Sequence, residues 1–237
     1  MKISNGVKIG GLQKVTLIDY PGKIAATVFL IGCNFRCPWC YSAELVLPEK
    51  IEAQPKIPKK DFFKFLKEKK GLLEGVTVCG GEPCLNKDLP KFCKKIKKMG
   101  FFVKLDTNGS NPTLLKKLID GKLVDYVAMD IKGPKEKYSE FSGVKVNIKK
   151  IQKSINILKK GEVDCEFRST IVPSLHTKED VIEMAKWIKG AKKYYLQNFR
   201  PEKTIDPNFE KIKPYPQEYL LEIQKAIVPF FEVCLVR

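Results

Sequence analysis

Three cysteines lie close together in the first part of the chain, at Cys33, Cys37 and Cys40, with the spacing C-x3-C-x2-C. Three thiolates from one short loop can each bind one iron of a cubic cluster, which leaves the fourth iron without a protein thiolate, unlike the usual four-cysteine site. An open iron is what a catalytic cluster needs. Zinc is the main alternative, but a structural zinc site takes four ligands, and the only histidine is His176.

A glycine-rich segment, TVCGGEP at 77–83, follows the next apolar stretch. Gly80 and Gly81 let the backbone approach a ligand closely, and Glu82 can accept a hydrogen bond from an ammonium group. A Gly-Gly pair is also typical of a plain strand-to-loop turn. The presence of the cysteine motif in the same chain favours a role of the glycine-rich segment in ligand binding.

Two further segments carry charged and amide side chains: LDTNG at 105–109 and AMDIK at 128–132. Asp106 and Asn108 can form a simple Asx turn before the glycine, and Lys132 can be an ordinary surface lysine. Both segments nevertheless end an apolar stretch, as the glycine-rich segment does. This shared position indicates that they belong to one site.

These motifs need a scaffold, and the apolar pattern predicts one. Apolar stretches typical of buried strands alternate with segments whose apolar residues recur at helical spacing. Such alternation predicts a largely parallel sheet with right-handed crossovers, in which ligands bind outside the carboxyl ends of the strands. We therefore expect all the motifs on one rim. The predicted strands are 24–31, 76–79, 101–105, 124–131, 165–172 and 193–199, with a short final strand at 231–236, and the predicted helices are 58–70, 89–99, 112–119, 148–158, 178–188 and 217–228.

The cysteine spacing, with the aromatic Trp39 before the last cysteine, resembles the signature of the radical S-adenosylmethionine superfamily. The resemblance implies an α/β fold built as an open partial (β/α)6 barrel with a largely parallel six-stranded sheet and short terminal additions. It also implies two cofactors, a [4Fe–4S] cluster on the three cysteines and S-adenosylmethionine. In that superfamily an electron passed through the cluster breaks the sulfonium bond, and a 5′-deoxyadenosyl radical abstracts a hydrogen from the substrate.

The same resemblance implies roles for individual residues. Glu82, in an element similar to the superfamily's GGEP, would bind the methionine amino group, and Lys132 would lie near the methionine carboxylate. Arg168 could pair with that carboxylate or with a neighbouring acid. Gln197 could contact the adenosine. The complete predicted set of cofactor-binding residues is Trp39, Tyr41, Gly80, Gly81, Glu82, Asp106, Asn108, Asp130, Lys132, Arg168 and Gln197.

The stretch GGLQKVTLIDYPGK at 10–23 is similar to activating proteins of anaerobic ribonucleoside-triphosphate reductase and, more broadly, to the pyruvate formate-lyase activase group. That similarity implies two partners: a glycyl radical enzyme as protein substrate, and a reduced flavodoxin- or ferredoxin-type electron donor. One departure bears on the substrate. Activases commonly place His-Asn-Pro after the last cysteine, whereas Tyr41-Ser42-Ala43 follows Cys40 here.

The length of 237 residues suits one domain, which we predict over 1–237 with the cluster loop at 32–41 and a C-terminal extension at about 201–237. The polar start MKISNG has no apolar stretch with a cleavage site. The longest apolar run, at 24–33, is about half of the ~20 residues that cross a bilayer. We therefore expect a cytoplasmic protein without membrane contact.

The formal net charge is +17, and only 4 of the 44 basic residues are arginine. Lysine is a hydrated point charge, whereas arginine supplies bidentate contacts to phosphates and bases, so a lysine-rich surface explains the charge better than nucleic-acid binding does. Bulk attraction to RNA stays open, and with it a radical enzyme that modifies RNA. A non-enzymatic iron–sulfur or zinc binding module is the third reading, but it leaves Glu82, Asp130 and Lys132 without a shared purpose.

The other five cysteines are too scattered for a second standard cluster, and a reducing compartment makes disulfides unfavourable. Two of them flank the glycine-rich segment and could be redox-active, or the first could be a small buried residue. Two others fit the core and the last fits the final strand. These residues are Cys79 and Cys84, Cys93 and Cys165, and Cys234. We expect His176 to be a loop or capping residue, not a ligand.

Overall fold

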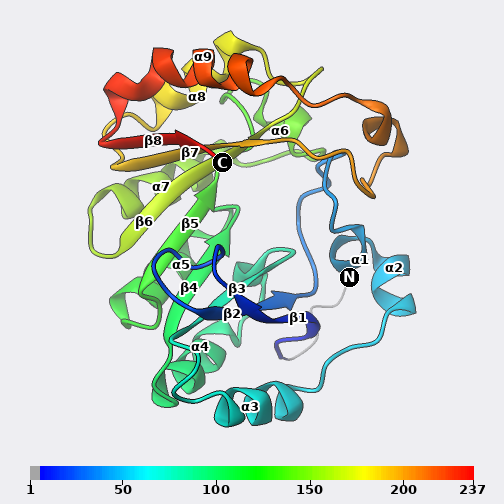
Figure 1. The fold of residues 1–237 in the computed structure, drawn as a ribbon, viewed down its shortest axis with the longest axis vertical. Helices are drawn as coiled ribbons and strands as arrows, with labels where there is room; N and C mark the ends of the chain where they lie inside the picture. The colour runs from blue at the N-terminus through cyan, green and yellow to red at the C-terminus, as the bar shows by residue number, and fades with distance from the viewer. Residues whose placement is uncertain (1–5) are drawn as a thin grey trace.

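In a computed structural model of the chain, which describes residues 6–237, a single sheet of eight strands runs in the order β1 to β8 (Figure 1). Strands β2 to β8 are parallel, and β1 pairs antiparallel with β2. The sheet is not closed, because β1 and β8 stand at its two ends. The strands are β1 Ile9–Thr16, β2 Ala25–Leu30, β3 Gly75–Gly80, β4 Phe102–Thr107, β5 Tyr126–Asp130, β6 Asp164–Ile171, β7 Lys193–Asn198 and β8 Val233–Val236.

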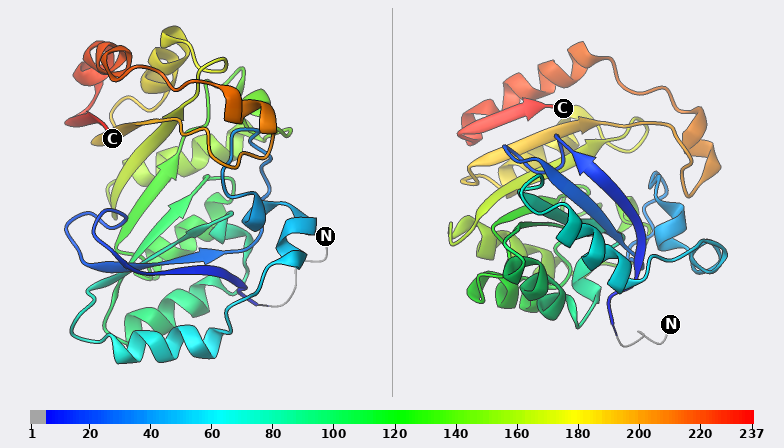
Figure 2. Two further views of the ribbon diagram at one scale, coloured as in Figure 1. Left: turned by 45° about the vertical axis from the view of Figure 1, so that its right-hand side comes forward. Right: turned by 60° about the horizontal axis from the view of Figure 1, so that its bottom comes forward.

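Amphipathic helices connect the parallel strands and lie along the outer side of the curved sheet (Figure 2). The long ones are α3 Lys59–Glu68, α4 Leu89–Lys98, α5 Pro112–Asp120, α7 Ile148–Lys159, α8 Lys178–Trp187 and α9 Gln217–Ile227. Shorter helices are α1 Ala43–Val46, α2 Pro48–Ala53 and α6 Tyr138–Phe141, and 3-10 turns occur at Pro83–Leu85, Pro207–Lys211 and Val228–Phe230. None of the helices described is long and apolar enough to cross a bilayer.

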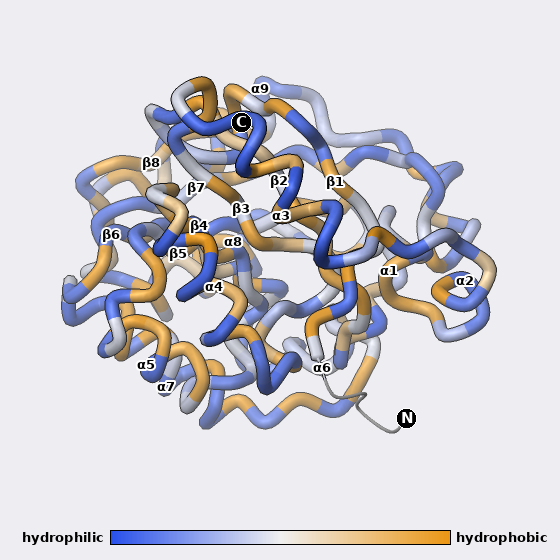
Figure 3. The backbone as a smooth tube through the Cα atoms, turned by 90° about the horizontal axis from the view of Figure 1, so that it is seen from below, coloured by the Kyte–Doolittle hydropathy of each residue, from blue (hydrophilic) through white to orange (hydrophobic). Residues whose placement is uncertain are grey.

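The two faces of the sheet differ in chemistry. Side chains alternate between the faces of a strand, and in β4 the outward Val103 and Leu105 are fully buried under helices, whereas Lys104 and Asp106 point into the barrel. In Figure 3 hydrophobic and hydrophilic residues alternate along the helices, for example α5 and α7, as expected of helices with one face on the sheet. The outer layer is the main hydrophobic core, and the inner face is left for polar side chains.

The predicted α/β fold is confirmed, and each predicted strand and long helix is present within a few residues. The sheet has eight strands where six were expected, because β8 joins β7 in parallel and β1 adds an edge beside β2. The pattern does not predict β1. Its sequence, IGGLQKVT, contains two glycines and is mostly half-buried or exposed, as an edge strand that packs on one neighbour permits.

Candidate active site

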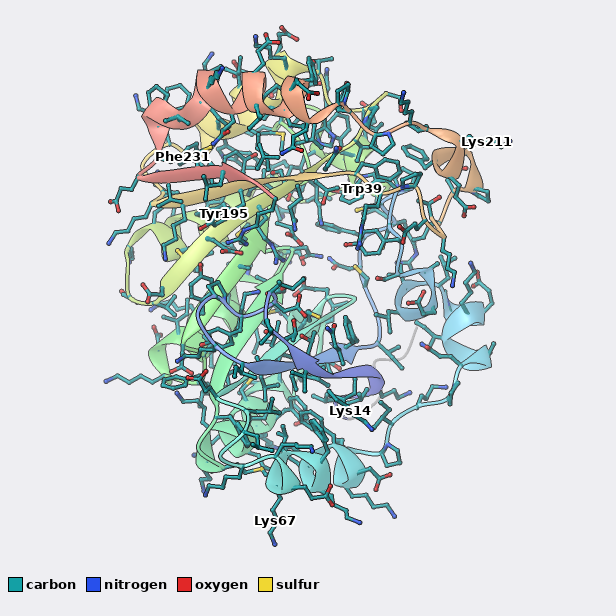
Figure 4. All side chains as sticks on the ribbon, in the orientation of Figure 1. Lys14, Trp39, Lys67, Tyr195, Lys211 and Phe231 are labelled. Carbon is teal, nitrogen blue, oxygen red and sulfur yellow. The ribbon has the colours of Figure 1, made fainter. Side chains whose placement is uncertain are left out.

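A cavity of about 470 Å³ opens inside the barrel at the carboxyl ends of the strands. Every predicted site residue except Glu82 lines it, including all three cysteines of the loop. In Figure 4 Trp39 lies inside the molecule near this cavity, whereas Lys67 and Lys211 point outward. The topology brings these residues together because parallel strands end at the same rim, as the sequence pattern predicts.

The cysteine loop is held by hydrogen bonds to its backbone. The Arg36 guanidinium donates to the carbonyl oxygens of Cys33 (2.8 Å) and Phe35 (2.7 Å). The Arg36 amide donates to the Ser142 carbonyl oxygen at 2.8 Å, which ties the loop to the end of α6. These hydrogen bonds fix the backbone conformation of the loop that carries the three thiols.

The C-terminal extension adds two more bonds to the same loop. The amide of Ile205 donates to the Cys40 carbonyl oxygen at 3.0 Å, and the amide of Asp206 donates to the Pro38 carbonyl oxygen at 2.9 Å. The segment 204–206 thus runs across the loop as a strap. Thr204 is buried and its hydroxyl donates to the Asp206 carbonyl oxygen at 2.7 Å, which fixes the strap's own turn.

The donor set fits an iron–sulfur cluster better than a single zinc ion. Within residues 6–237 no group of three His, Cys, Asp or Glu side chains is spaced to hold one metal ion. Thiolates that bind separate irons of a cube stand farther apart than ligands of one ion. Burial raises the pKa of Cys33 to about 11 and that of Cys37 to about 12, and it also raises the pKa of Cys40. A metal ion or cluster bound by these thiols would therefore have to displace their protons.

Five charged side chains form what we call the charged row along the inner face. The Lys132 Nζ lies 3.3 Å from Asp130 Oδ2, and Arg168 Nε lies 3.2 Å from Asp130 Oδ1. On its other side Arg168 Nη2 lies 3.0 Å from Asp106 Oδ2, and Lys104 pairs with the second oxygen of Asp106. Three cations and two anions leave one positive charge in surplus over the row as a whole, and Lys132 ends the row near the cysteine loop.

Burial would penalise each charge of the row if it stood alone. For Asp130, burial favours the neutral acid, but Lys132 and Arg168 outweigh it, so its pKa lies below the usual value. For Lys132, burial is likewise outweighed by Asp130 and by the nearby Cys37, which raise its pKa. Asp130 and Lys132 are therefore ionised at neutral pH. Arg168 was expected to pair either with the cofactor carboxylate or with a neighbouring acid, and in the structure it pairs with Asp106 and Asp130.

Lys132 also contacts the cysteine loop. Its Nζ lies 5.0 Å from the centre of the Trp39 ring, within the range of a cation–π interaction. The indole Nε1 of Trp39 is buried and has no hydrogen-bond partner within residues 6–237. An unpaired buried donor is costly, so this N–H is available to a bound ligand's acceptor.

Glu82 lies apart from the other predicted site residues. It is fully buried, and its carboxylate accepts hydrogen bonds from the Cys84 amide (2.8 Å), the Thr107 hydroxyl (2.8 Å) and the Asn108 amide (2.6 Å). The carboxylate is used between β3 and β4 and Glu82 does not line the cavity, so its contact with an ammonium group stays a prediction. Burial raises its pKa, which these hydrogen bonds oppose.

The glycine pair serves close packing of backbones. A Cβ at Gly81 would come within 2.2 Å of the Gly32 carbonyl oxygen, and Gly80 has φ +115° with a Cβ position 2.4 Å from Leu30 backbone atoms. The Glu82 amide donates to the same Gly32 oxygen at 2.7 Å. The glycines thus let the glycine-rich segment lie directly against the start of the cysteine loop.

Asn108 holds the other side of that loop. Its side-chain amide donates to Asn34 Oδ1 at 3.0 Å, and Asn34 Nδ2 donates to the Ser110 hydroxyl at 3.0 Å. The predicted pocket residue is therefore also a support for the cysteine loop. This link joins the end of β4 to residues between Cys33 and Cys37.

His176 is a loop residue whose ring bonds to the backbone of Val172 and Lys132. Its Nδ1 accepts from the Val172 amide at 3.1 Å, so Nε2 carries the proton and donates to the Lys132 carbonyl oxygen at 2.9 Å. Burial lowers the pKa of His176 to about 4. The neutral ring thus fixes the backbone of Lys132.

Sequence reasoning missed several cavity residues. Asp19 comes from the turn between β1 and β2, and Arg200 follows β7. Thr27, Thr77 and Thr170 lie on the inner face of β2, β3 and β6. Alternation of polar with apolar residues along each strand is the signal that could have found the threonines. Among the remaining cysteines, Cys79 lines the cavity and Cys84 and Cys93 are buried, and all eight are free thiols.

Comparison with known proteins agrees with this geometry. The family model described as "Radical SAM superfamily" matches residues 27–188. A Methanocaldococcus jannaschii protein, named provisionally as a glycyl-radical enzyme activating enzyme, is 34% identical over 97% of this chain and 95% of its own length. The crystal structure of QueE from Escherichia coli aligns with a TM-score of 0.57 at 16% identity, over 97% of this chain and 93% of that one. Streptococcus suis SuiB bound to S-adenosylmethionine aligns with a TM-score of 0.66 at 16% identity, over 86% of this chain and 48% of that one. With the family model spanning most of the chain and the cysteine loop inside an open barrel, this protein belongs to the radical S-adenosylmethionine superfamily.

Proposed function

We propose that the protein is an activase, which binds one [4Fe–4S] cluster and S-adenosylmethionine in the cavity and removes a hydrogen atom from a glycine of a partner enzyme, such as an anaerobic ribonucleotide reductase. When bound, the cluster and S-adenosylmethionine supply an electron and a carbon-centred radical able to abstract that hydrogen. The observation that carries the proposal is that the three-cysteine loop and the charged row face one cavity.

The chain's own residues divide the work of binding. Cys33, Cys37 and Cys40 would each hold one iron, and their loop would need no large rearrangement because it is already tied at both sides. Lys132 is the group best suited to a carboxylate, since it is the end of the charged row that lines the cavity beside the cysteine loop. Asp130 orients it by a charge-assisted hydrogen bond.

Other cavity residues would bind the rest of S-adenosylmethionine. Trp39 offers a ring face and an unpaired N–H, and Tyr41 and Gln197, the latter in β7, also line the cavity. Arg168 and Asp106 would act mainly by holding Asp130, because their charged atoms are already paired with each other. Backbone groups of Gly80 and Gly81 would contact the ligand.

The protein substrate is supported by the full-length similarity to the provisionally named activating enzyme of M. jannaschii. A reduced flavodoxin or ferredoxin would supply the electron, in the cytoplasm. Tyr41, in place of the histidine usual in activases, lies at the mouth beside Arg200, whose guanidinium carbon is 5.3 Å from the Tyr41 ring centre. A second candidate, action on RNA, is favoured only by the net charge of +17.

The test uses anaerobically reconstituted full-length protein with dithionite, S-adenosylmethionine and the glycyl radical enzyme of the same organism. We expect about four irons per chain, formation of 5′-deoxyadenosine, and a glycine-centred doublet in the electron paramagnetic resonance spectrum of the partner. A parallel reaction with RNA from the same organism should show no modified nucleoside. Stoichiometric zinc without a redox-active iron form, or a modified nucleoside with no glycyl signal, would contradict the proposal.

A further inference from the structure

The end of β1 and the turn that follows it expose apolar side chains beside the cavity. Val15 is 54% exposed, Leu17 71% and Ile18 83%, and Ile18 also lines the cavity. In Figure 1 this turn, coloured blue, lies in front of strands β4 and β5. An apolar edge that continues a cavity wall to the outside is typical of an interaction site.

This exposure is built into an ordered turn. The Thr16 hydroxyl accepts hydrogen bonds from the amides of Ile18 (3.3 Å) and Asp19 (3.2 Å), and the ring of Tyr20 is buried against Tyr126. The chain therefore places Tyr20 inward and Leu17 outward by specific bonds. The apolar side chains are presented to water while the backbone beneath them is fixed.

Asp19 completes this edge with a prearranged acceptor. Its Oδ2 accepts a hydrogen bond from the buried Thr27 hydroxyl at 2.6 Å. Its other carboxylate oxygen has no partner among the residues that the structure describes, and Asp19 lines the cavity. An oriented carboxylate of this kind suits an N–H donor, such as a backbone amide, and repels a phosphate.

We propose that the edge formed by Val15, Leu17, Ile18 and Asp19 docks an extended segment of an acidic partner protein. Asp19 accepts an N–H of that segment, and Leu17 and Ile18 cover an apolar side chain of it. The inference rests on the proposed function, whose partner it gives a docking site. Two observations favour this occupant: the net charge of +17 attracts an acidic macromolecule, and an apolar edge with a carboxylate suits a polypeptide and not an RNA backbone.

The experiment compares the wild-type chain with the double variant Val15→Ser/Leu17→Ser, whose two side chains do not line the cavity. The matched control is Leu72→Ser, because Leu72 is 65% exposed and lies in the connection after α3, away from the cavity. The probes are the glycyl radical enzyme of the same organism and, separately, RNA from that organism. The measurements are the Kd for each probe, iron content, 5′-deoxyadenosine formed without partner, and glycyl radical yield.

We expect the double variant to keep its iron and its partner-free 5′-deoxyadenosine formation, and to bind the enzyme about tenfold or more weakly, since two apolar side chains no longer bury their surface against the partner. Leu72→Ser should match wild type, and Asp19→Asn should also weaken binding. If wild type installs the radical and the double variant binds equally well, the docking site is wrong and the proposed function stands. If wild type installs no radical, the proposed function fails and the docking site with it. A double variant that loses affinity for RNA alone would overturn the choice of a protein.

Discussion

The two faces of the same strands are built on different principles. On the outer face of β4, Val103 and Leu105 are buried under helices, as in any α/β sheet. On the inner face, the side chain of Lys104 is only 1% exposed, and its amine is paired with Asp106 in the charged row. Apolar burial stabilises the outer face directly, whereas the inner face is stable only because each charge has a partner.

The comparison teaches where the fold can tolerate change. Loss of an outer residue leaves a void whose cost falls on the whole domain. Loss of an inner residue leaves a neighbouring charge without its partner and alters the cavity before it alters the fold. Substitutions on the two faces should therefore separate stability from cofactor chemistry.

The largest effect should come from the inner rim itself. Cys37→Ala should lose the cluster and all cleavage of S-adenosylmethionine, because two thiolates cannot replace three. The matched control is Cys93→Ala, which removes a buried thiol from the helix layer on the outer side. Iron analysis after anaerobic reconstitution should give about four irons per chain for the control, as for wild type. A Cys37→Ala protein with a full cluster would refute the assignment of this loop.

On the outer face, Leu105→Ala should lower the free energy of unfolding by roughly 2–5 kcal/mol, the usual cost of such a cavity. The affinity of the folded fraction for S-adenosylmethionine should stay at the wild-type value, because Leu105 points away from the cavity. Denaturant unfolding and ligand titration on the same preparation measure the two quantities. A large fall in affinity with little loss of stability would break the division between the faces.

An intermediate effect is expected from His176, which connects the two layers. Its pKa is lowered from 6.5 to about 4 in the folded protein, so the unfolded chain binds more protons between these values. The associated stability is present above pH 6.5 and is lost as the pH falls toward 4, by about 3 kcal/mol, since one unit corresponds to ~1.36 kcal/mol. Asp180, whose charge raises the pKa of His176, remains ionised over this range because its own pKa is lowered.

His176→Gln provides the control for that pH dependence. The unfolding free energy of the variant should depend less steeply on pH between 6.5 and 4 than that of wild type, whatever its value at neutral pH. Urea unfolding at several pH values gives both curves. Parallel curves would show that the buried ring does not titrate as described.

The smallest effect of the four concerns Lys132. Lys132→Ala removes a charge-assisted hydrogen bond to a carboxylate, worth roughly 1.5–3 kcal/mol, so the affinity for S-adenosylmethionine should fall about tenfold to a hundredfold or somewhat more. The iron content should be unchanged, because Lys132 is not a ligand. Lys67→Ala, on the outward surface in Figure 4, should behave as wild type. Equal affinity in the two lysine variants would show that Lys132 has no contact with the cofactor.

Much of the fold follows from patterns that act over short distances. Apolar stretches and helical spacing predict the strands β2 to β8 and the long helices, because burial of an apolar face decides these elements locally. The cysteine spacing predicts the loop and its chemistry for the same reason: three ligands within one short segment need little help from the rest of the chain. The strand β1 is not predicted from the sequence, because its two glycines and its exposed side chains give no regular alternation of apolar and polar residues.

The sequence by itself therefore determines the order of the elements, the rim on which the motifs gather and the class of chemistry that the cysteine loop permits. Only the tertiary structure decides how each charged or polar group is used. The Glu82 carboxylate accepts hydrogen bonds from three donors of the protein, and Arg168 pairs with two carboxylates. Asp19 lines the cavity from a turn that is distant in sequence from the other site residues. The physical reason is that a buried charge takes its partner from whichever strand lies beside it in space, and sequence spacing does not record that neighbour.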